Sequence, residues 1–273
     1  MAFHVCLAAA SCALSLGGGA RSRPPPAFAF SPGGLLFPYH VGVAYELLSL
    51  RQIQSTTPLG GSSAGAIVAA AVACGVGEFE VRQGLDELLI DVRSGIKLNP
   101  ALRRQLDRLL PDNCAQLAFA HSLTICYTQI FPWPKRHVVT EWSSKQDLID
   151  CIAASCNWPF FFSRWPLVWC RGGLAIDGFF AVPRERFGCP PLPGDFWTIA
   201  ITPLPRVQLP AFQGLSLIQP GCRDETALPL SDASWFQYAM KPADDATVAR
   251  MIDIGKEHAR RWLDDVRSTP PRL

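Results

Sequence analysis

The sequence predicts an α/β fold, a three-layer sandwich with a mainly parallel central sheet. A short apolar run at residues 27–31, bounded by prolines and glycines, is typical of a buried strand. Apolar residues follow at helical spacing over residues 39–50. A second strand-length segment, 58–61, then leads into an alanine-rich helix at 66–74. Alternation of strands and helices favours a parallel sheet that is covered by helices.

The rest of the chain continues this alternation. Leucines at one face predict a helix at 100–110, and residues 144–156 form a helix pattern that opens with a capping box of Ser144 and Asp147. Residues 244–266 form a final amphipathic helix pattern. Further strands are predicted at 123–130, 137–142, 168–176 and 197–202.

Length and composition indicate one large domain. The chain has 273 residues, of which 49% are hydrophobic and 18% charged, so it can build a substantial core. The net charge of +2 is too small to suggest a nucleic-acid partner. We expect the folded domain to span residues 27–268. Residues 1–26 are acid-poor and carry arginine, serine and a proline run, so they are either a flexible extension or a targeting segment for a plastid or mitochondrion.

The ten cysteines do not predict a metal site. They form no C-x-x-C pair, and several lie inside apolar stretches. We therefore expect mostly buried, free thiols, no metal ion and no cofactor.

The segment Gly61-Ser62-Ser63-Ala64-Gly65 matches G-x-S-x-G. In this motif a nucleophilic serine sits on a sharp turn between a strand and a helix, and the flanking Gly61 and Gly65 leave room for the backbone. The predicted strand before it and helix after it support Ser63 as the nucleophile. An ordinary glycine-rich turn is the alternative.

An ester hydrolase also needs amide donors for the oxyanion and a base for the serine. Gly33 and Gly34, in the turn after the first strand, can supply backbone N–H groups. None of the five histidines has a neighbourhood that marks it as the base. Asp177, followed by Gly178, ends an apolar strand and is well placed for a site built from strand ends, although these residues alone favour a plain Asp-Gly turn.

Taken together, these elements resemble the patatin-like phospholipase family, most closely its animal-type lipases and acyltransferases of lipid storage. The likeness extends from about residue 27 to about residue 183. The stretches that carry it are 30–34, 39–43, 61–65, 144–149, 154–160 and 176–178.

The resemblance implies a catalytic dyad in which Ser63 attacks the ester carbonyl and Asp177 accepts its proton. Gly33 and Gly34 would hold the oxyanion. It implies a lipid acyl hydrolase of triacylglycerol lipase or phospholipase type that works at a membrane or lipid-droplet surface from the cytoplasm. A lipid transacylase is an alternative, because hydrolysis and transacylation pass through the same acyl-enzyme. A lipid-binding protein with little activity is another, because Pro32, Phe37 and Phe179 replace small residues of the family pattern.

Two further readings stay open. An α/β-hydrolase triad would need a downstream histidine such as His258, but Ser63 comes early for that fold. A non-enzymatic membrane or lipid-droplet scaffold is the second, because the stretch Trp158 to Trp169, WPFFFSRWPLVW, is unusually aromatic. Such a stretch suits a membrane interface or an acyl groove, or else core and turn.

Overall fold

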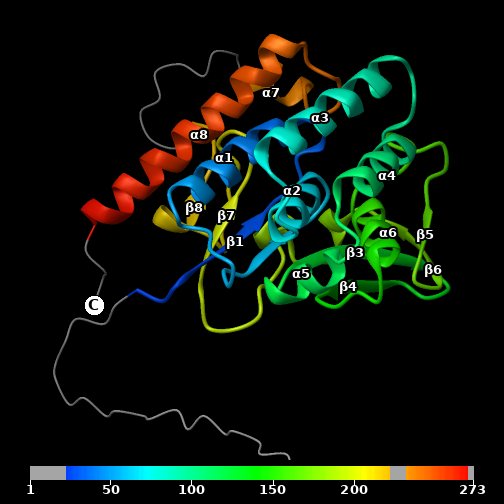
Figure 1. The fold of residues 1–273 in the computed structure, drawn as a ribbon, viewed down its shortest axis with the longest axis horizontal. Helices are drawn as coiled ribbons and strands as arrows, with labels where there is room; N and C mark the ends of the chain where they lie inside the picture. The colour runs from blue at the N-terminus through cyan, green and yellow to red at the C-terminus, as the bar shows by residue number, and fades with distance from the viewer. Residues whose placement is uncertain (1–22, 222–231, 270–273) are drawn as a thin grey trace, which may run out of the picture.

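The computed structural model describes residues 23–221 and 232–269 (Figure 1). The strands are β1 (Pro26–Phe30), β2 (Leu59–Gly61), β3 (Thr124–Phe131), β4 (Lys135–Val139), β5 (Val168–Cys170), β6 (Gly173–Ile176), β7 (Trp197–Ile201) and β8 (Leu217–Ile218). The α-helices are α1 (Phe37–Ser49), α2 (Ala64–Ala73), α3 (Glu78–Arg93), α4 (Leu98–Leu109), α5 (Cys114–Ala120), α6 (Lys145–Ser155), α7 (Asp232–Gln237) and α8 (Asp245–Ser268).

The described strands form one sheet in the order β5-β6-β3-β2-β1-β7-β8, with β4 paired to β3. Five neighbouring strands pair in parallel, as the sequence predicts: β3, β2, β1, β7 and β8. β4, β5 and β6 pair antiparallel and make the sheet mixed at one edge. The α/β fold class is therefore confirmed, with a parallel centre and an antiparallel border.

Alternate residues of the central strands face different layers, as strand geometry requires. Phe28 and Phe30 face the main core, which is shared with α1, α2, α6 and α8. Ala29 faces a second, smaller cluster with Cys189 and Phe212. This second layer is built largely from the irregular chain between β6 and β8 and from short 3₁₀ turns. It therefore has fewer helices than the predicted three-layer sandwich, in which helices cover both faces of the sheet.

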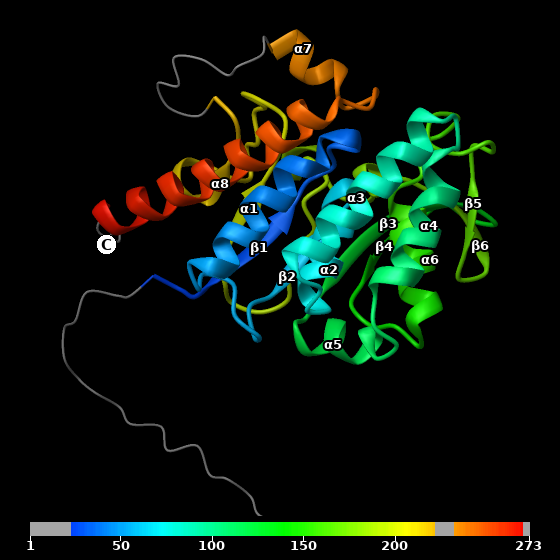
Figure 2. The same ribbon diagram turned by 45° about the horizontal axis from the view of Figure 1, so that its top comes forward.

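Helices α1 and α8 lie side by side, although they come from opposite ends of the sequence (Figures 1 and 2). Glycines allow the close approach, because a Cβ on Gly42 would lie 2.0 Å from the Ile252 carbonyl oxygen. The Tyr39 hydroxyl lies 2.9 Å from Nδ1 of His258, and Arg260 pairs with Glu46 at 2.7 Å. The C-terminal helix is thus part of the same core as the first helix.

Two predicted elements need correction. Residues 168–176 are not one strand but the hairpin of β5 and β6, because Arg171 and Gly172 both adopt positive φ (46° and 81°) and reverse the chain. The strand predicted at 137–142 begins earlier and ends at Val139. Helix α3 was not predicted: its exposed Phe79 and Ile90 blur the apolar periodicity of the sequence.

The predicted free thiols are confirmed for the seven cysteines among the described residues, all of them buried. Cys6, Cys12 and Cys222, like the predicted extension up to residue 22, lie outside the described residues. Within 23–221 and 232–269, no helix combines the length and apolar character that a membrane span requires.

Candidate active site

Ser63 stands on a tight turn between β2 and α2. Its backbone has φ 53° and ψ −127°, a conformation that a non-glycine residue rarely adopts. The two motif glycines explain how the turn closes. A Cβ on Gly61 would lie 2.2 Å from the Gly65 carbonyl carbon, and a Cβ on Gly65 would lie 2.3 Å from the Phe30 carbonyl oxygen. Such distances are accessible only to glycine, so the elbow expected from G-x-S-x-G is present.

The sheet register brings the glycine loop beside this elbow. Phe30 at the end of β1 pairs with Gly61 at the end of β2, so the segments that follow leave the sheet at the same level. Gly34 has φ 56°, and a Cβ there would lie 2.2 Å from the Ala239 carbonyl oxygen. Among the hydrogen bonds of the described residues, the amides of Gly33 and Gly34 donate to no protein acceptor. These amides are available to an anion.

His40 holds the start of this loop. Its Nε2 lies 2.9 Å from the Ser31 carbonyl oxygen, so this nitrogen carries the proton. Burial lowers the pKa of His40 to about 4, which keeps the ring neutral at physiological pH. His40 therefore acts as a neutral donor that orients the loop, a role that its position on a predicted helix did not reveal.

Asp177 follows β6, which lies on the side of β3 away from β2. β6 runs antiparallel to β3, with Ile176 paired to Thr128, so the chain arrives beside the part of β3 that lies just beyond β2. The Asp177 amide donates to the Asn157 carbonyl at 3.0 Å, and its Oδ1 accepts from the Phe179 N–H at 2.8 Å. Oδ2 has no regular hydrogen-bond partner among the described residues.

Asp177 is 1% exposed and Ser63 is 4% exposed. Desolvation raises the pKa of Asp177 to about 7, while the Phe179 amide and the nearby Ser63 side chain act in the opposite direction and lower the pKa. The structure thus brings the side chains of Ser63 and Asp177 together, and Oδ2 of Asp177 has no other partner among the described residues. Its pKa suits a base at neutral pH.

Ser155, at the end of α6, was not predicted as part of the site. Its Oγ accepts a hydrogen bond of 2.9 Å from the Ser63 amide. A Cβ on Gly178 would lie only 2.7 Å from the same oxygen. Gly178 is therefore needed for the close approach of the Asp177 turn to α6. The adjacent Ser62 is no competing nucleophile, because its hydroxyl donates to the Gly188 carbonyl at 2.6 Å.

The three departures from the family pattern pack tightly around the site. Phe37 is buried in the main core at the start of α1. Pro32 lies against Gly188, where a Cβ would come within 2.3 Å of the proline ring. Phe179 forms aromatic contacts with Trp158 at 6.0 Å and with Phe187 at 5.4 Å.

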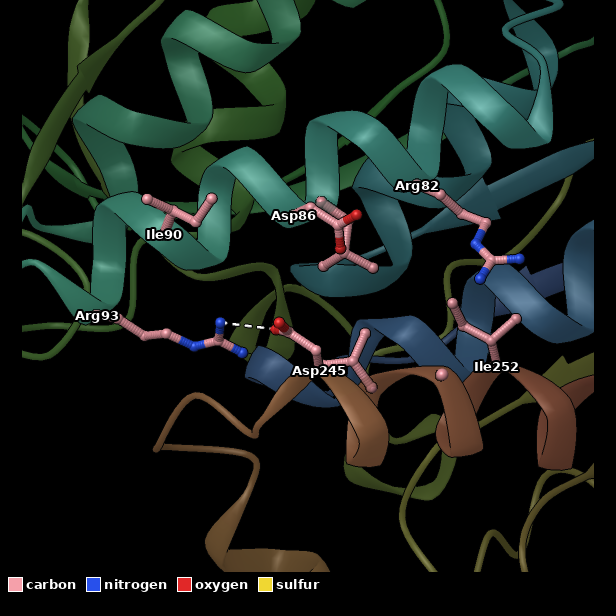
Figure 3. Close-up of a pocket in the computed structure, with 9 residues that line it drawn as sticks. Arg82, Asp86, Ile90, Arg93, Asp245 and Ile252 are labelled. Carbon is pink, nitrogen blue, oxygen red and sulfur yellow. Dashed lines mark hydrogen bonds and ion pairs between the residues drawn. The ribbon is translucent and has the colours of Figure 1, made fainter.

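A separate groove between α3 and α8 has a volume of about 280 Å³ (Figure 3). Arg82, Asp86 and Ile90 line its α3 side, and Arg93 pairs across it with Asp245 at 2.8 Å. None of the predicted site residues lines this groove, and its exposed ion pair resembles ordinary surface packing between two helices.

A strained serine at a strand-to-helix turn, beside free amides and a buried carboxylate, defines a class of α/β proteins with a nucleophile elbow. The sequence model for patatin-like phospholipase matches residues 28–186, more than half of the 273-residue chain. The chain belongs to the patatin-like phospholipase family, a family of lipid-acting enzymes.

Individual relatives agree with this family. An omega-hydroxyceramide transacylase of Homo sapiens is 29% identical over 188 residues, covering 65% of this chain and 33% of that protein. Its Mus musculus counterpart is 30% identical over 189 residues, covering 65% and 30%. This chain therefore matches about a third of the length of these relatives. VipD from Legionella pneumophila shares the fold, with a TM-score of 0.53 at 10% identity over 89% of this chain and 67% of VipD.

Proposed function

We propose that this chain cleaves ester bonds of lipids through an acyl-enzyme on Ser63, with Asp177 as the base. The observation that carries the proposal is the buried Asp177 carboxyl beside the strained serine. Its pKa is about 7, and its Oδ2 has no other partner among the described residues. Family membership supports a lipid as the substrate.

In the first half of the proposed reaction, Asp177 takes the hydroxyl proton of Ser63 as Oγ attacks the carbonyl carbon. The amides of Gly33 and Gly34 stabilise the negative oxygen of the tetrahedral intermediate. The intermediate collapses, the alcohol leaves with the proton from Asp177, and the acyl group stays on Ser63.

In the second half, an acceptor hydroxyl gives its proton to Asp177 and attacks the carbonyl carbon of the acyl-serine. The bond between this carbon and Ser63 Oγ then breaks, and Asp177 returns the proton to Ser63. Water as acceptor yields a free fatty acid, and a lipid alcohol yields a new ester. Hydrolysis is the first candidate. Transacylation is the second, and the transacylase names of the two mammalian relatives favour it.

The proposal is tested by reaction of the purified chain with a fluorophosphonate probe, followed by peptide mass spectrometry. We expect the label on Ser63, no labelling of Ser63→Ala, and strongly slowed labelling of Asp177→Asn. Ser94→Ala is the control, because Ser94 is exposed and its hydroxyl only bonds the Asp91 carbonyl. A wild-type chain that folds and stays unlabelled would leave a lipid-binding protein as the better description.

The acceptor is tested separately. The enzyme is incubated with a labelled triacylglycerol, with and without a long-chain lipid alcohol. A free fatty acid in both reactions supports hydrolysis. A new ester that forms at the expense of the fatty acid supports transacylation.

A further inference from the structure

The aromatic stretch of the sequence is neither wholly core nor wholly surface. Phe162 is 6% exposed, whereas Phe160 is 74% and Trp165 is 71% exposed. Trp169, in β5, is 62% exposed, and the end of β3 and the turn after it add Phe131 at 59% and Trp133 at 77%. We call these five exposed side chains, Phe131, Trp133, Phe160, Trp165 and Trp169, the aromatic face. So many exposed large aromatics in two short segments indicate a surface that meets an apolar partner.

The sheet register joins the two segments. Trp169 of β5 pairs with Leu174 of β6, and Leu174 pairs with Phe131 of β3, so the three side chains stand in a row across neighbouring strands. Cys170 points the other way, toward Cys151 of α6, with 3.9 Å between the sulfurs. The row therefore lies on the side of this sheet edge that α6 leaves uncovered.

The two segments that carry the aromatic face contain basic residues and no acidic ones. Lys135, Arg136 and Arg164 are exposed, and neither residues 129–139 nor residues 158–170 contain an aspartate or a glutamate. The strand register places Arg136 on the same side of the sheet as Trp169, whereas Lys135 points to the other side of this edge. Arg171 does not add to this charge, because it forms an ion pair with Asp147 at 2.8 Å. A partner with negative surface charge matches this arrangement.

The same aromatic segment borders both halves of the candidate active site. Trp158 packs against Phe180 at 5.2 Å, and the preceding Asn157 bonds Asp177 through its backbone and Pro166 through its side chain, at 2.9 Å for the latter. On the other side, the Phe162 ring lies 3.5 Å from where a Cβ on Gly34 would be. A partner held by the exposed aromatics would lie next to this site.

We infer that the aromatic face docks the protein on a lipid bilayer with anionic headgroups and so places the candidate active site at the lipid surface. Indole and phenyl rings suit the boundary between headgroups and acyl chains, and the basic side chains would meet the phosphates. The inference rests on the proposed function for its lipid substrate, but the binding itself does not require turnover.

The test is co-sedimentation of the Ser63→Ala chain with phosphatidylcholine vesicles that do or do not contain phosphatidylglycerol. We expect binding that is stronger with phosphatidylglycerol and weakens with salt. The double variant Trp133→Ser/Trp165→Ser should lose roughly tenfold or more of the partition coefficient. The matched control is Phe79→Ser/Phe119→Ser, which removes aromatics that are 75% and 63% exposed on α3 and α5 and should bind as before.

A triple variant, Lys135→Gln/Arg136→Gln/Arg164→Gln, tests the charge. It should lose the preference for phosphatidylglycerol while it keeps the weaker binding to phosphatidylcholine. Equal binding of the aromatic variant and its control would overturn the inference. So would a wild-type chain that ignores both vesicles, or one in which light scattering shows these aromatics joining two copies of the chain instead.

Activity on a soluble short-chain ester separates this inference from the proposed function. With the serine restored, Trp133→Ser/Trp165→Ser should hydrolyse such an ester at the wild-type rate, because its changes lie outside the catalytic groups. If vesicle binding behaves as expected while no variant cleaves the ester, the proposed function fails and the docking surface stands.

Discussion

At the residue scale, the protonation state of the Asp177 carboxyl determines whether the proposed site can react. Asp177 accepts a proton only when it is ionised, and burial places its pKa at about 7. A free aspartate would be ionised at all physiological pH values but would be a much weaker base.

The rate of ester cleavage should therefore rise with pH through neutrality. Below a pH of about 7 Asp177 holds a proton and cannot accept another, so kcat/KM should fall about tenfold for each unit of pH. The measurement is a kcat/KM profile on a soluble ester. A flat profile down to the ordinary aspartate range would contradict the assignment of Asp177 as the base.

The same burial predicts a stability change in Asp177→Asn. The folded-state pKa is raised above the unfolded value of 3.8, so the stability contribution of the neutral carboxyl is full below pH 3.8 and is lost as pH rises to about 7. Asparagine does not ionise. The variant should be more stable than wild type by about 4 kcal/mol near pH 8 and similar near pH 4. Thermal unfolding at both pH values tests this, and a variant that is less stable at the higher pH would contradict it.

Ser155 is expected to position Ser63 without touching the substrate. Ser155→Ala leaves the buried Ser63 amide without its acceptor, and kcat should fall on the order of 10- to 100-fold with little change in KM. The pH profile should keep its midpoint, because Asp177 is unchanged. A change confined to thermal stability, with kcat intact, would show that Ser155 is structural only.

At the scale of the elements, the elbow depends on how closely α2 approaches β1. Gly65→Ala should destabilise the protein by about 3 kcal/mol or more, because its methyl group would meet the backbone of Phe30. Gly84→Ala is the control: its methyl group, also within a helix, would meet only the end of the Leu109 side chain, at 2.5 Å. It should stay within about 1 kcal/mol of wild type, since alanine also favours the helix.

Denaturant unfolding with intrinsic fluorescence measures both glycine variants. Equal stabilities of the two variants would show that the backbone contact at Phe30 does not restrict the elbow. The comparison also separates packing from helix propensity, which favours alanine in both helices.

Strand boundaries show what short-range pattern can and cannot predict. Residues 168–176 look like one strand because the apolar residues on both sides of Arg171 and Gly172 are similar in character. Only the positive φ values of these two residues reveal a hairpin. The hairpin reverses the chain, so that β6 runs back along β3 and Asp177 approaches Ser63 from beyond β3.

At the scale of the whole molecule, the match to the family ends at residue 186, yet the core continues into α8. Gly255→Val should lower Tm by roughly 10 °C, because a Cβ there would lie 2.4 Å from the Tyr39 carbonyl oxygen on α1. Ala246→Val places the same side chain at an exposed position of α8 and should cost only a few degrees, which calorimetry can resolve. Equal Tm values would mean that α8 is only loosely attached.

The sequence by itself determined the α/β class, the parallel strands at the centre and the family, because apolar periodicity and the order of glycine motifs are local signals. It also predicted Ser63, Asp177, Gly33 and Gly34 as the candidate site. The structure places Asp177 beside Ser63 and the glycine loop at the neighbouring strand end, and the catalytic roles are proposals.

Only the tertiary structure decided which groups support that site. The Ser155 acceptor, the neutral His40 and the aromatic face depend on contacts between segments far apart in the chain. The raised pKa of Asp177 arises in the same way, since it comes from desolvation by the folded protein around it. Such effects come from burial and distance in space, which no local pattern of residues encodes.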